Sequence, residues 1–292
     1  MTILISATNE LGQPASLFNT TASIFSTAAF AAVDADNLIV VTDSQARKVW
    51  IISRDTEAAF ALDAEFLSPQ GVAFDSKDRI LIADRHAHTI KAFTKQGEFI
   101  EDIGRRGVGQ NRLGGPLGIV VDPLDGTIIV SEYDQHRLQA FDADGESLWL
   151  FGDEGDGDTE FTGPADMVID PVHRLLWVAD HCSGRVRAFK LDNSLDIVYT
   201  LTGFKKPHGL TIDARGLLYV TDSRAYHVFE RVIETETGAV LYLKIHESAH
   251  FDSHPSGIAD LGRGEMLVCA GPSVVVTKPL QIADRVVGVL LE

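Results

Sequence analysis

The chain has 292 residues, of which 45% are apolar and 23% are charged, and its formal net charge is −17. Such an acidic balance argues against a nucleic-acid partner, because binding phosphates requires clustered Lys and Arg. Two cysteines are too few for a disulfide framework, and no apolar run approaches the ~18 residues of a membrane-spanning helix. The first basic residue is Arg47, so the N-terminal stretch lacks the positive region of a signal peptide. We expect a cytoplasmic protein with a sizeable core.

One pattern recurs along the chain. The stretch GPADMVIDPVHRLLWVADHCSGRVRAF, residues 163–189, contains two apolar runs, an acidic residue and a third apolar run. Its six copies cover residues 26–52, 68–93, 115–141, 163–189, 206–232 and 254–278. The acid that ends the second run is Asp43, Asp84, Glu132, Asp180 or Asp222, with Ala270 in the sixth copy. These positions lie 41 to 48 residues apart, a period that indicates a repeat architecture.

The apolar runs within each copy predict strands. They are short, rich in Val and Ile, and separated by Gly, Asp, Asn or Pro. A fourth run follows at residues 97–104, 146–152 and 196–203. Six units of four antiparallel strands predict an all-β fold, a six-bladed β-propeller. The alternative, a pair of β-sandwiches, would not explain so regular a repeat.

The repeat also predicts where the blades begin and end within a single domain. They are expected at residues 26–62, 63–104, 105–152, 153–203, 204–247 and 248–292. A further strand is expected at residues 2–7, before the first unit. We expect it to pair with the last blade and so close the ring, because a ring must join its two chain ends.

The unit resembles the NHL repeat. Its pattern is Pro-x-Gly-(Ile/Val)-x-(Val/Phe)-Asp, then (Ile/Val)-x-(Asp/Glu), then Arg-(Val/Leu)-x-x-Phe, with glycine-rich connections at residues 103–122 and 151–170. This resemblance covers residues 26–278 and implies a six-bladed NHL-like propeller. The family includes RNA-binding and partner-binding modules, and the similar amidating lyases for peptidyl-hydroxyglycine hold zinc on histidines from several blades. Residues 206–223 are also similar to a strand of gluconolactonase-like propellers, with His208 in place of its Asn. Fold alone does not choose among these activities.

An acid and a base recur five residues apart in four copies. The pairs are Asp43 and Lys48, Glu132 and Arg137, Asp180 and Arg185, and Asp222 and His227. A catalytic pair would not recur four times, so the pattern predicts a structural ion pair across each hairpin.

The segment DEGDGDTE, residues 153–160, has the alternating carboxylates of a calcium loop. It lacks the Glu at the twelfth position, and the preceding blade has the basic segment RRGVGQNR in the same place. We therefore expect a solvated connection.

The candidate site lies at the mouth of the central channel. The positions just after each Pro of the innermost strands are Gln70, Leu117, Ala165 with Asp166, His208 and Ser256, and Thr27 takes this place in the first copy. Asp166 stands where most copies have Gly, and such departures from a repeat mark sites. The loops after the second strands can reach the same rim and supply Arg85, His86, Tyr133, His181 and Ser223.

Two kinds of chemistry are open to these residues. If the protein is an enzyme, His208 is the expected general base, with Asp166 orienting it and Tyr133 or Arg85 as electrophilic support. The expected ligand-binding residues are Gln70, His86, His181, Ser223 and Ser256. Asp166, His181, His208 and His254 could together bind zinc, and calcium in the channel is an alternative.

We therefore carry two hypotheses. The first is a propeller that binds a small molecule or a protein segment at the mouth of the central channel. The second is a metal-dependent hydrolase, lactonase-like, or a lyase at the same mouth. RNA binding would require Arg105, Arg106 and Arg112 to form one exposed patch, and the net charge disfavours it. Neither the nucleic-acid nor the membrane class is expected, and the oligomeric state is open.

Overall fold

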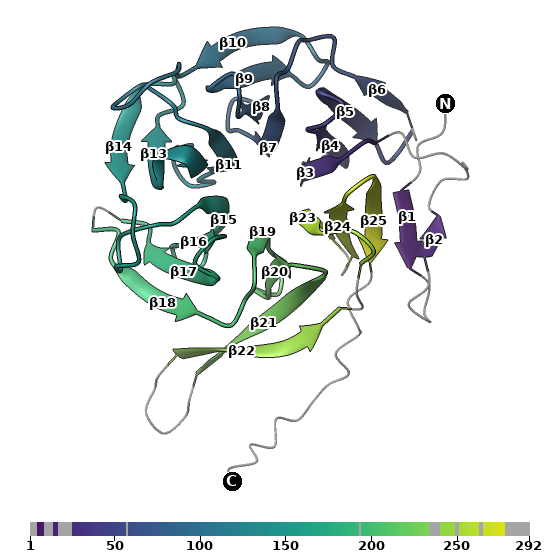
Figure 1. Cartoon of the computed structure of the whole chain (residues 1–292). Coiled ribbons are helices and arrows are strands. Elements are labelled where there is room, and N and C mark those ends of the chain that lie inside the picture. The colour runs from purple at the N-terminus through teal and green to yellow at the C-terminus, as the bar shows by residue number, and fades with distance from the viewer. Residues whose placement is uncertain are drawn as a thin grey trace.

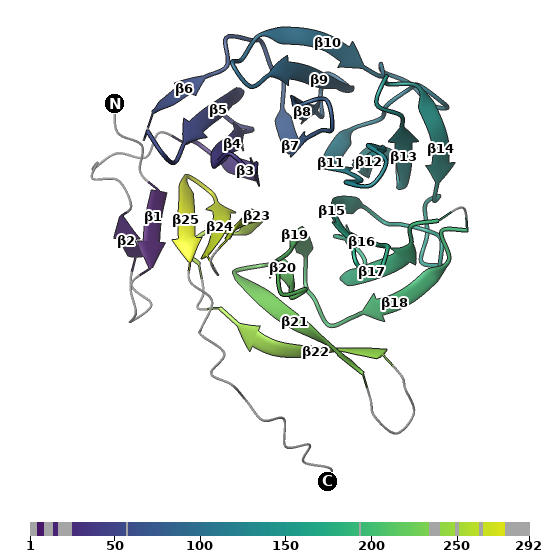
Figure 2. The same ribbon diagram turned by 180° about the vertical axis from the view of Figure 1, so that it is seen from behind.

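The computed structural model describes residues 5–8, 14–16, 25–56, 58–192, 194–233, 240–248, 251–262 and 265–277. Its strands form six sheets in a ring around a central channel, as the two views in Figures 1 and 2 show. The fold is thus the all-β, six-bladed propeller that the repeat predicts. Within the described residues, no helix is long and apolar enough to cross a membrane.

The first three sheets each have four antiparallel strands in chain order, running outward from the channel. The first blade comprises β3 (Ala28–Val33), β4 (Leu38–Asp43), β5 (Lys48–Ser53) and β6 (Ala59–Ala61). The second comprises β7 (Pro69–Phe74), β8 (Arg79–Asp84), β9 (Thr89–Thr94) and β10 (Phe99–Ile103). The third comprises β11 (Pro116–Val121), β12 (Ile128–Glu132), the 3₁₀ turn η1 (Tyr133–Gln135), β13 (Arg137–Phe141) and β14 (Ser147–Phe151).

The remaining sheets continue the ring. The fourth blade comprises β15 (Pro164–Asp170), β16 (Leu175–Asp180), β17 (Arg185–Lys190) and β18 (Ile197–Leu201). The fifth comprises β19 (Pro207–Ile212), β20 (Leu218–Asp222), β21 (Ala225–Ile233) and β22 (Val240–Glu247). The sixth combines β23 (Pro255–Gly262), β24 (Glu265–Ala270) and β25 (Ser273–Thr277) with β1 (Ile5–Thr8) and β2 (Pro14–Ser16).

The sixth sheet joins distant parts of the chain. β1 pairs in parallel with β25, with Ser6 opposite Val275. On the channel side, the Ser256 hydroxyl of β23 donates to the Ala29 carbonyl of β3 at 2.7 Å, which ties the last blade to the first. The sequence predicts that the last blade extends to residue 292, and its residues 278–292 lie outside the described residues; closure of the ring by the N-terminal strand stays a prediction.

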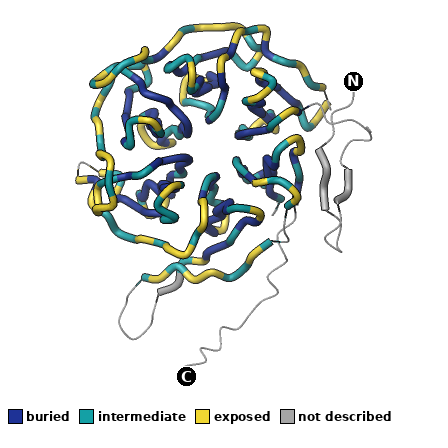
Figure 3. Tube along the Cα trace, in the orientation of Figure 1, coloured by how far each residue is buried: buried dark blue, intermediate teal, exposed yellow. Residues whose placement is uncertain are grey.

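Burial follows the position of a strand within its blade. The second strands are mainly apolar, and β8, β12 and β16 are buried at every position, because neighbouring blades cover both of their faces. The outer strand β14 alternates between partly buried and exposed residues, and Figure 3 shows the same two classes around the rim. The innermost strand of each blade lines the channel: β3, β7, β11, β15, β19 and β23 (Figure 1).

Innermost strands of neighbouring blades approach closely, which explains the glycine in the repeat. A Cβ atom on Gly118 would collide with the Ala165 carbonyl, and one on Gly209 with the Ser256 carbonyl. Hydroxyl groups then link the blades at this contact. Ser131 donates to the Ala165 carbonyl at 2.5 Å, and Thr221 donates to the Ser256 carbonyl at 2.7 Å.

The recurring acids have a structural role, but the hairpin ion pair is only part of it. Each acid accepts hydrogen bonds from backbone amides just before its own innermost strand, as Asp84 does from Leu67 and Ser68 at 2.9 and 2.7 Å. The predicted ion pairs form at Glu132–Arg137 (2.7 Å) and Asp180–Arg185 (3.2 Å), and His227 Nε2 lies 3.5 Å from Asp222 Oδ2.

The first blade departs from this prediction. Although Asp43 lies opposite Lys48 in the sheet, no ion pair joins the two side chains, both of which the structure describes. The Lys48 ammonium lies 5.7 Å from the centroid of the Trp50 ring instead. Asp43 is satisfied by the amides of Ser26 and Thr27, so it needs no base.

The carboxylate-rich segment 153–160 surrounds a guanidinium. Arg187 of β17 donates to the carbonyls of Gly157 and Asp158 at 2.9 and 3.0 Å, and to the carbonyl of Glu160. It also donates to Asp180 Oδ2 at 3.1 Å. These carbonyls, which a calcium ion would otherwise need as ligands, already have a cationic partner.

Candidate functional site at the channel mouth

Three histidines from the fourth, fifth and sixth blades meet at one mouth of the channel. His181 follows β16, His208 is the second residue of β19, and His254 directly precedes β23. The ring centroids of His181 and His208 are 5.5 Å apart, and His254 lies 6.3 Å from each of the other two. Sequence reasoning named all three, and the structure brings them together because each occupies the mouth end of its blade.

The hydrogen bonds of these rings indicate where their protons lie. His181 Nδ1 is 3.1 Å from the Pro207 carbonyl, and His254 Nδ1 is 3.0 Å from the Pro255 carbonyl. A carbonyl only accepts, so each Nδ1 carries the proton and, in the neutral ring, each Nε2 keeps its lone pair. The buried Nδ1 of His208 has no hydrogen-bond partner.

All three imidazoles are held in the neutral form. Burial lowers the pKa values of His181 and His254, and it lowers the pKa of His208 to about 3. The nearby imidazoles also disfavour a charge on His208. The mouth therefore presents lone pairs, and His181 and His208 are half-buried while His254 is exposed.

A second group borders His181 on the side of the third blade. The Tyr133 ring lies 6.4 Å from the His181 ring, and its hydroxyl is 3.1 Å from Cys182 Sγ. The Arg85 guanidinium lies 4.7 Å from the centroid of the Tyr133 ring and donates to Asp134 Oδ1 at 2.6 Å. Tyr133 and Arg85 thus stand beside the histidines as expected, while Cys182 enters the site as the partner of Tyr133.

The other predicted binding residues have varied surroundings. Ser256 links blades through its hydroxyl, as described above, and Gln70 Nε2 donates to Ser68 Oγ at 3.0 Å. Ser223 Oγ is 3.5 Å from Asp222 Oδ1, and His86 is exposed. Their role in ligand binding stays a prediction.

Asp166 lies deeper in the channel than the histidines. It is only 8% exposed, and its Oδ2 accepts a hydrogen bond of 3.0 Å from the Leu210 amide in the next blade. Burial raises the pKa of this carboxyl to about 7. Its departure from the repeat has a structural reason: the fourth blade has Ala179 where its neighbours have Ser131 and Thr221, so Asp166 supplies the link to the next blade.

Phe30 is the residue at this site that sequence reasoning missed. It occupies in β3 the position that glycine holds in most inner strands, and its ring centroid lies 5.3 Å from that of His208. The prediction used Thr27 for the first blade, whose inner strand lacks the proline. In the second blade, Pro69 lies opposite the structural acid Asp84, and in the first blade Ala28 lies opposite Asp43. Ala28 is therefore the counterpart of the proline, and Phe30, two residues later, is the counterpart of the glycine.

The predicted metal set does not converge. Among the described residues, no group of three or more His, Cys, Asp and Glu side chains is placed to hold a metal ion. No hydrogen bond or ring contact described here joins Asp166 to His181, His208 or His254. The side chains as placed therefore do not fit a zinc or calcium centre, and a metal cofactor stays a prediction.

The sequence also matches a known repeat family. Residues 66–93 match the NHL repeat, so the second blade carries an NHL repeat within a six-bladed propeller. No curated protein matches the chain.

Solved structures show the same fold in several enzymes. A streptogramin B lyase is 15% identical, with 88% of this chain and 94% of that chain covered and a TM-score of 0.64. A gluconolactonase from Xanthomonas campestris is 17% identical, with 89% and 88% covered and a TM-score of 0.64. A catalytically inactive histidine-to-alanine variant of virginiamycin B lyase from Staphylococcus aureus, solved with quinupristin, is 16% identical, with 86% and 80% covered and a TM-score of 0.61. Likeness at this identity shows the fold alone.

Proposed function

We propose that this NHL-type propeller binds a small polar molecule at the channel mouth, on the cluster formed by His181, His208 and His254. The observation that carries the proposal is the meeting of three neutral imidazoles, from three different blades, within 6.3 Å of one another. Side chains brought together from separate blades around a concave mouth are typical of ligand sites in propellers.

The chemistry of the cluster selects the ligand. His181 and His254 donate from Nδ1 to backbone carbonyls, so in the neutral ring each Nε2 atom is free to accept a hydrogen bond from a ligand. A matching ligand presents hydroxyl, amine or amide donors. The Tyr133 ring beside His181 adds an apolar wall on which the carbon skeleton of such a ligand can pack. A protein segment at this mouth, the other predicted occupant, is left to experiment.

The test uses histidine resonances in the intact protein. Protein with ¹³C- and ¹⁵N-labelled histidine is titrated with myo-inositol and acetamide, which carry donors, and with acetate, which only accepts. We expect shifts at His181 and His254 with the first two probes and little response to acetate, while the outer-strand His246 serves as the internal reference. His208→Ala should weaken the response and His246→Ala should not. Equal or stronger shifts with acetate would overturn the proposal.

A second candidate is base catalysis at the same mouth. The lone pair of the neutral His181 imidazole also accepts a proton from a bound substrate, and burial lowers its pKa so that the ring is neutral at pH 7. His208, whose pKa is lowered to about 3, is too weak a base for this step and would position the substrate. The loss of activity in the histidine variant of virginiamycin B lyase makes the comparison relevant. D-Glucono-1,5-lactone and quinupristin are the probes. Turnover that disappears in His181→Ala or His208→Ala, and persists in His246→Ala, would support this candidate, and absence of turnover would remove both substrate classes.

A further inference from the structure

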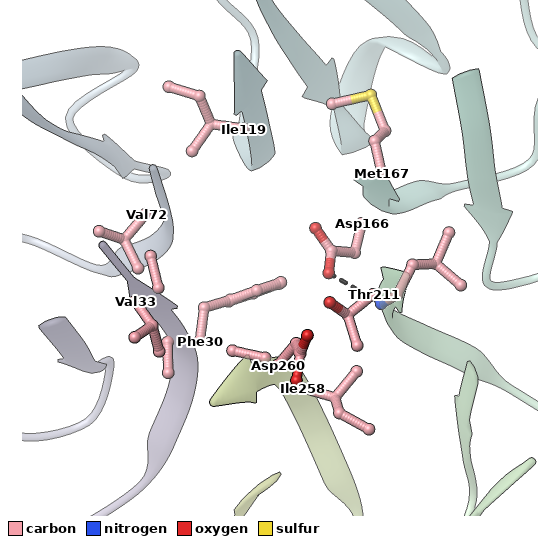
Figure 4. A pocket seen from close by; sticks show the side chains of 13 residues that line it. Phe30, Val33, Val72, Ile119, Asp166, Met167, Thr211, Ile258 and Asp260 are labelled. Carbon is pink, nitrogen blue, oxygen red and sulfur yellow. Dashed lines mark hydrogen bonds between the residues drawn. The ribbon is translucent and has the colours of Figure 1, made fainter. Parts of the chain in front are cut away.

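A separate cavity lies in the channel on the other side of Phe30. Its volume is about 290 Å³, and every innermost strand contributes to its wall. Aliphatic side chains such as Val72, Ile119 and Met167 are among the lining residues (Figure 4), but the surface that the walls expose to the cavity is mainly polar. None of the three mouth histidines lines it, whereas Phe30 both contacts His208 and lines the cavity. The ring of Phe30 therefore stands between the two spaces.

The polar groups of the cavity all favour a cation. Two carboxyl groups, Asp166 and Asp260, point into it together with the Thr211 hydroxyl, and no Lys, Arg or His is among the lining residues (Figure 4). Arg215, which acts on Asp260 from outside, is bound to Asp213 Oδ2 at 2.6 and 2.8 Å. Carboxyl groups in a cavity without a basic lining residue can accept a positive charge from a ligand.

Each carboxyl group is partly satisfied by backbone amides. Asp166 Oδ2 accepts from Leu210, and Asp260 Oδ1 accepts from Gly262 at 2.8 Å. Burial nevertheless raises the pKa values of both groups, because these bonds do not balance the loss of solvation. A cation in the cavity would supply the missing counter-charge.

We infer that the channel below Phe30 is a second binding site, for a small organic cation such as a protonated primary amine. The ammonium group would lie between Asp166, Asp260 and Thr211, and its short carbon skeleton would contact lining side chains such as Val72 and Ile119. The volume lies at the lower end of the ~300–1,000 Å³ of small-molecule pockets, which suits a ligand the size of benzylammonium. This site does not depend on the function proposed for the mouth.

Calorimetry at pH 8 with benzylammonium, benzyl alcohol and calcium chloride tests the inference in the full chain. We expect benzylammonium to bind at least about tenfold more tightly than benzyl alcohol, a difference of about 1.4 kcal/mol. Asp260→Asn and Asp166→Asn should each weaken binding several-fold. Asn keeps an oxygen for the Leu210 amide, so Asp166→Asn preserves the link between blades. Asp63→Asn, an exposed site outside the channel, is the matched control, and His181→Ala should leave binding unchanged.

The methyl resonances of the methionines locate the ligand. Met167 lines the cavity, whereas Met266 is buried in the core between the fifth and sixth blades. Benzylammonium should shift the Met167 methyl and leave Met266 in place. Equal affinity for amine and alcohol, preference for calcium, binding that survives Asp260→Asn unchanged, or a shift confined to Met266 would each overturn the inference.

Discussion

Replacing Asp166 by Asn should make the protein more stable, and the gain should depend on pH. The pKa of Asp166 is raised from its ordinary 3.8 to about 7 in the folded chain. The folded state therefore holds its proton more tightly, so the wild type loses stability as pH rises from 3.8 to 7. The difference between the two pKa values corresponds to about 4 kcal/mol of folding stability. The protein has this contribution below pH 3.8 and has lost it above pH 7. Asn does not titrate and escapes this loss.

Urea unfolding followed by the fluorescence of the buried Trp177 measures the effect. The free energy of unfolding is determined for wild type and Asp166→Asn at several values between pH 4 and pH 8. Other titrating groups are common to both proteins, so they cancel in the difference. Asp63→Asn is the control for removing a carboxylate.

The difference between the two proteins should grow by about 4 kcal/mol across this range and then level off. A difference that stays constant with pH would refute the reasoning, because it would mean that Asp166 titrates alike in the folded and unfolded chains. A loss of stability at every pH would mean that the carboxylate itself holds the fourth blade to the fifth.

Three further substitutions test the frame around the site by the same unfolding assay. Arg187→Leu should cost about 3–5 kcal/mol, because Asp180 and the carbonyls of residues 157–160 lose their buried partner; an unchanged midpoint would contradict this. Gly209→Ala should cost about 1–3 kcal/mol through the collision of its Cβ with the Ser256 carbonyl, and a neutral effect would show that the blades can separate. Ser131→Ala should cost about 1–3 kcal/mol, since it removes the link to the fourth blade; Ser147→Ala, on the rim, should cost less.

Much of the fold could be predicted because each blade repeats the same physical requirements. Each copy of the repeat has short apolar strands, most copies have a glycine at the contact between blades, and most have an acid that binds the loop entering the blade. These features recur at regular intervals in the sequence. The mouth histidines were predictable for the same reason, since they follow fixed points of the repeat. His181 comes directly after the structural Asp180, and His208 directly after Pro207.

The rest depends on distances that a repeat does not encode. Asp166 and His208 lie two residues and one residue after the first proline of their strands, so the sequence predicts that they are neighbours. In the structure Asp166 lines the channel cavity, whereas His208 belongs to the mouth cluster. Phe30 contacts His208 and lines the cavity with Asp166, and it lies in the one described copy of the strand that begins with Ala instead of Pro. The role of Arg187 was hidden likewise, because nothing in the sequence of its strand β17 shows that the side chain reaches a loop of the same blade.

The claim that the mouth is a site of neutral hydrogen-bond acceptors can be tested directly on the histidines. Long-range ¹H–¹⁵N spectra of histidine-labelled protein, recorded from pH 5 to pH 8, report the charge and tautomer of each ring. We predict that His181 and His254 are neutral near pH 7 with the proton on Nδ1, and that His208 stays neutral at pH 5, well above its pKa of about 3. Charged rings near pH 7, or protons on Nε2 of His181 and His254, would contradict the account, because the mouth would then present donors to its ligand.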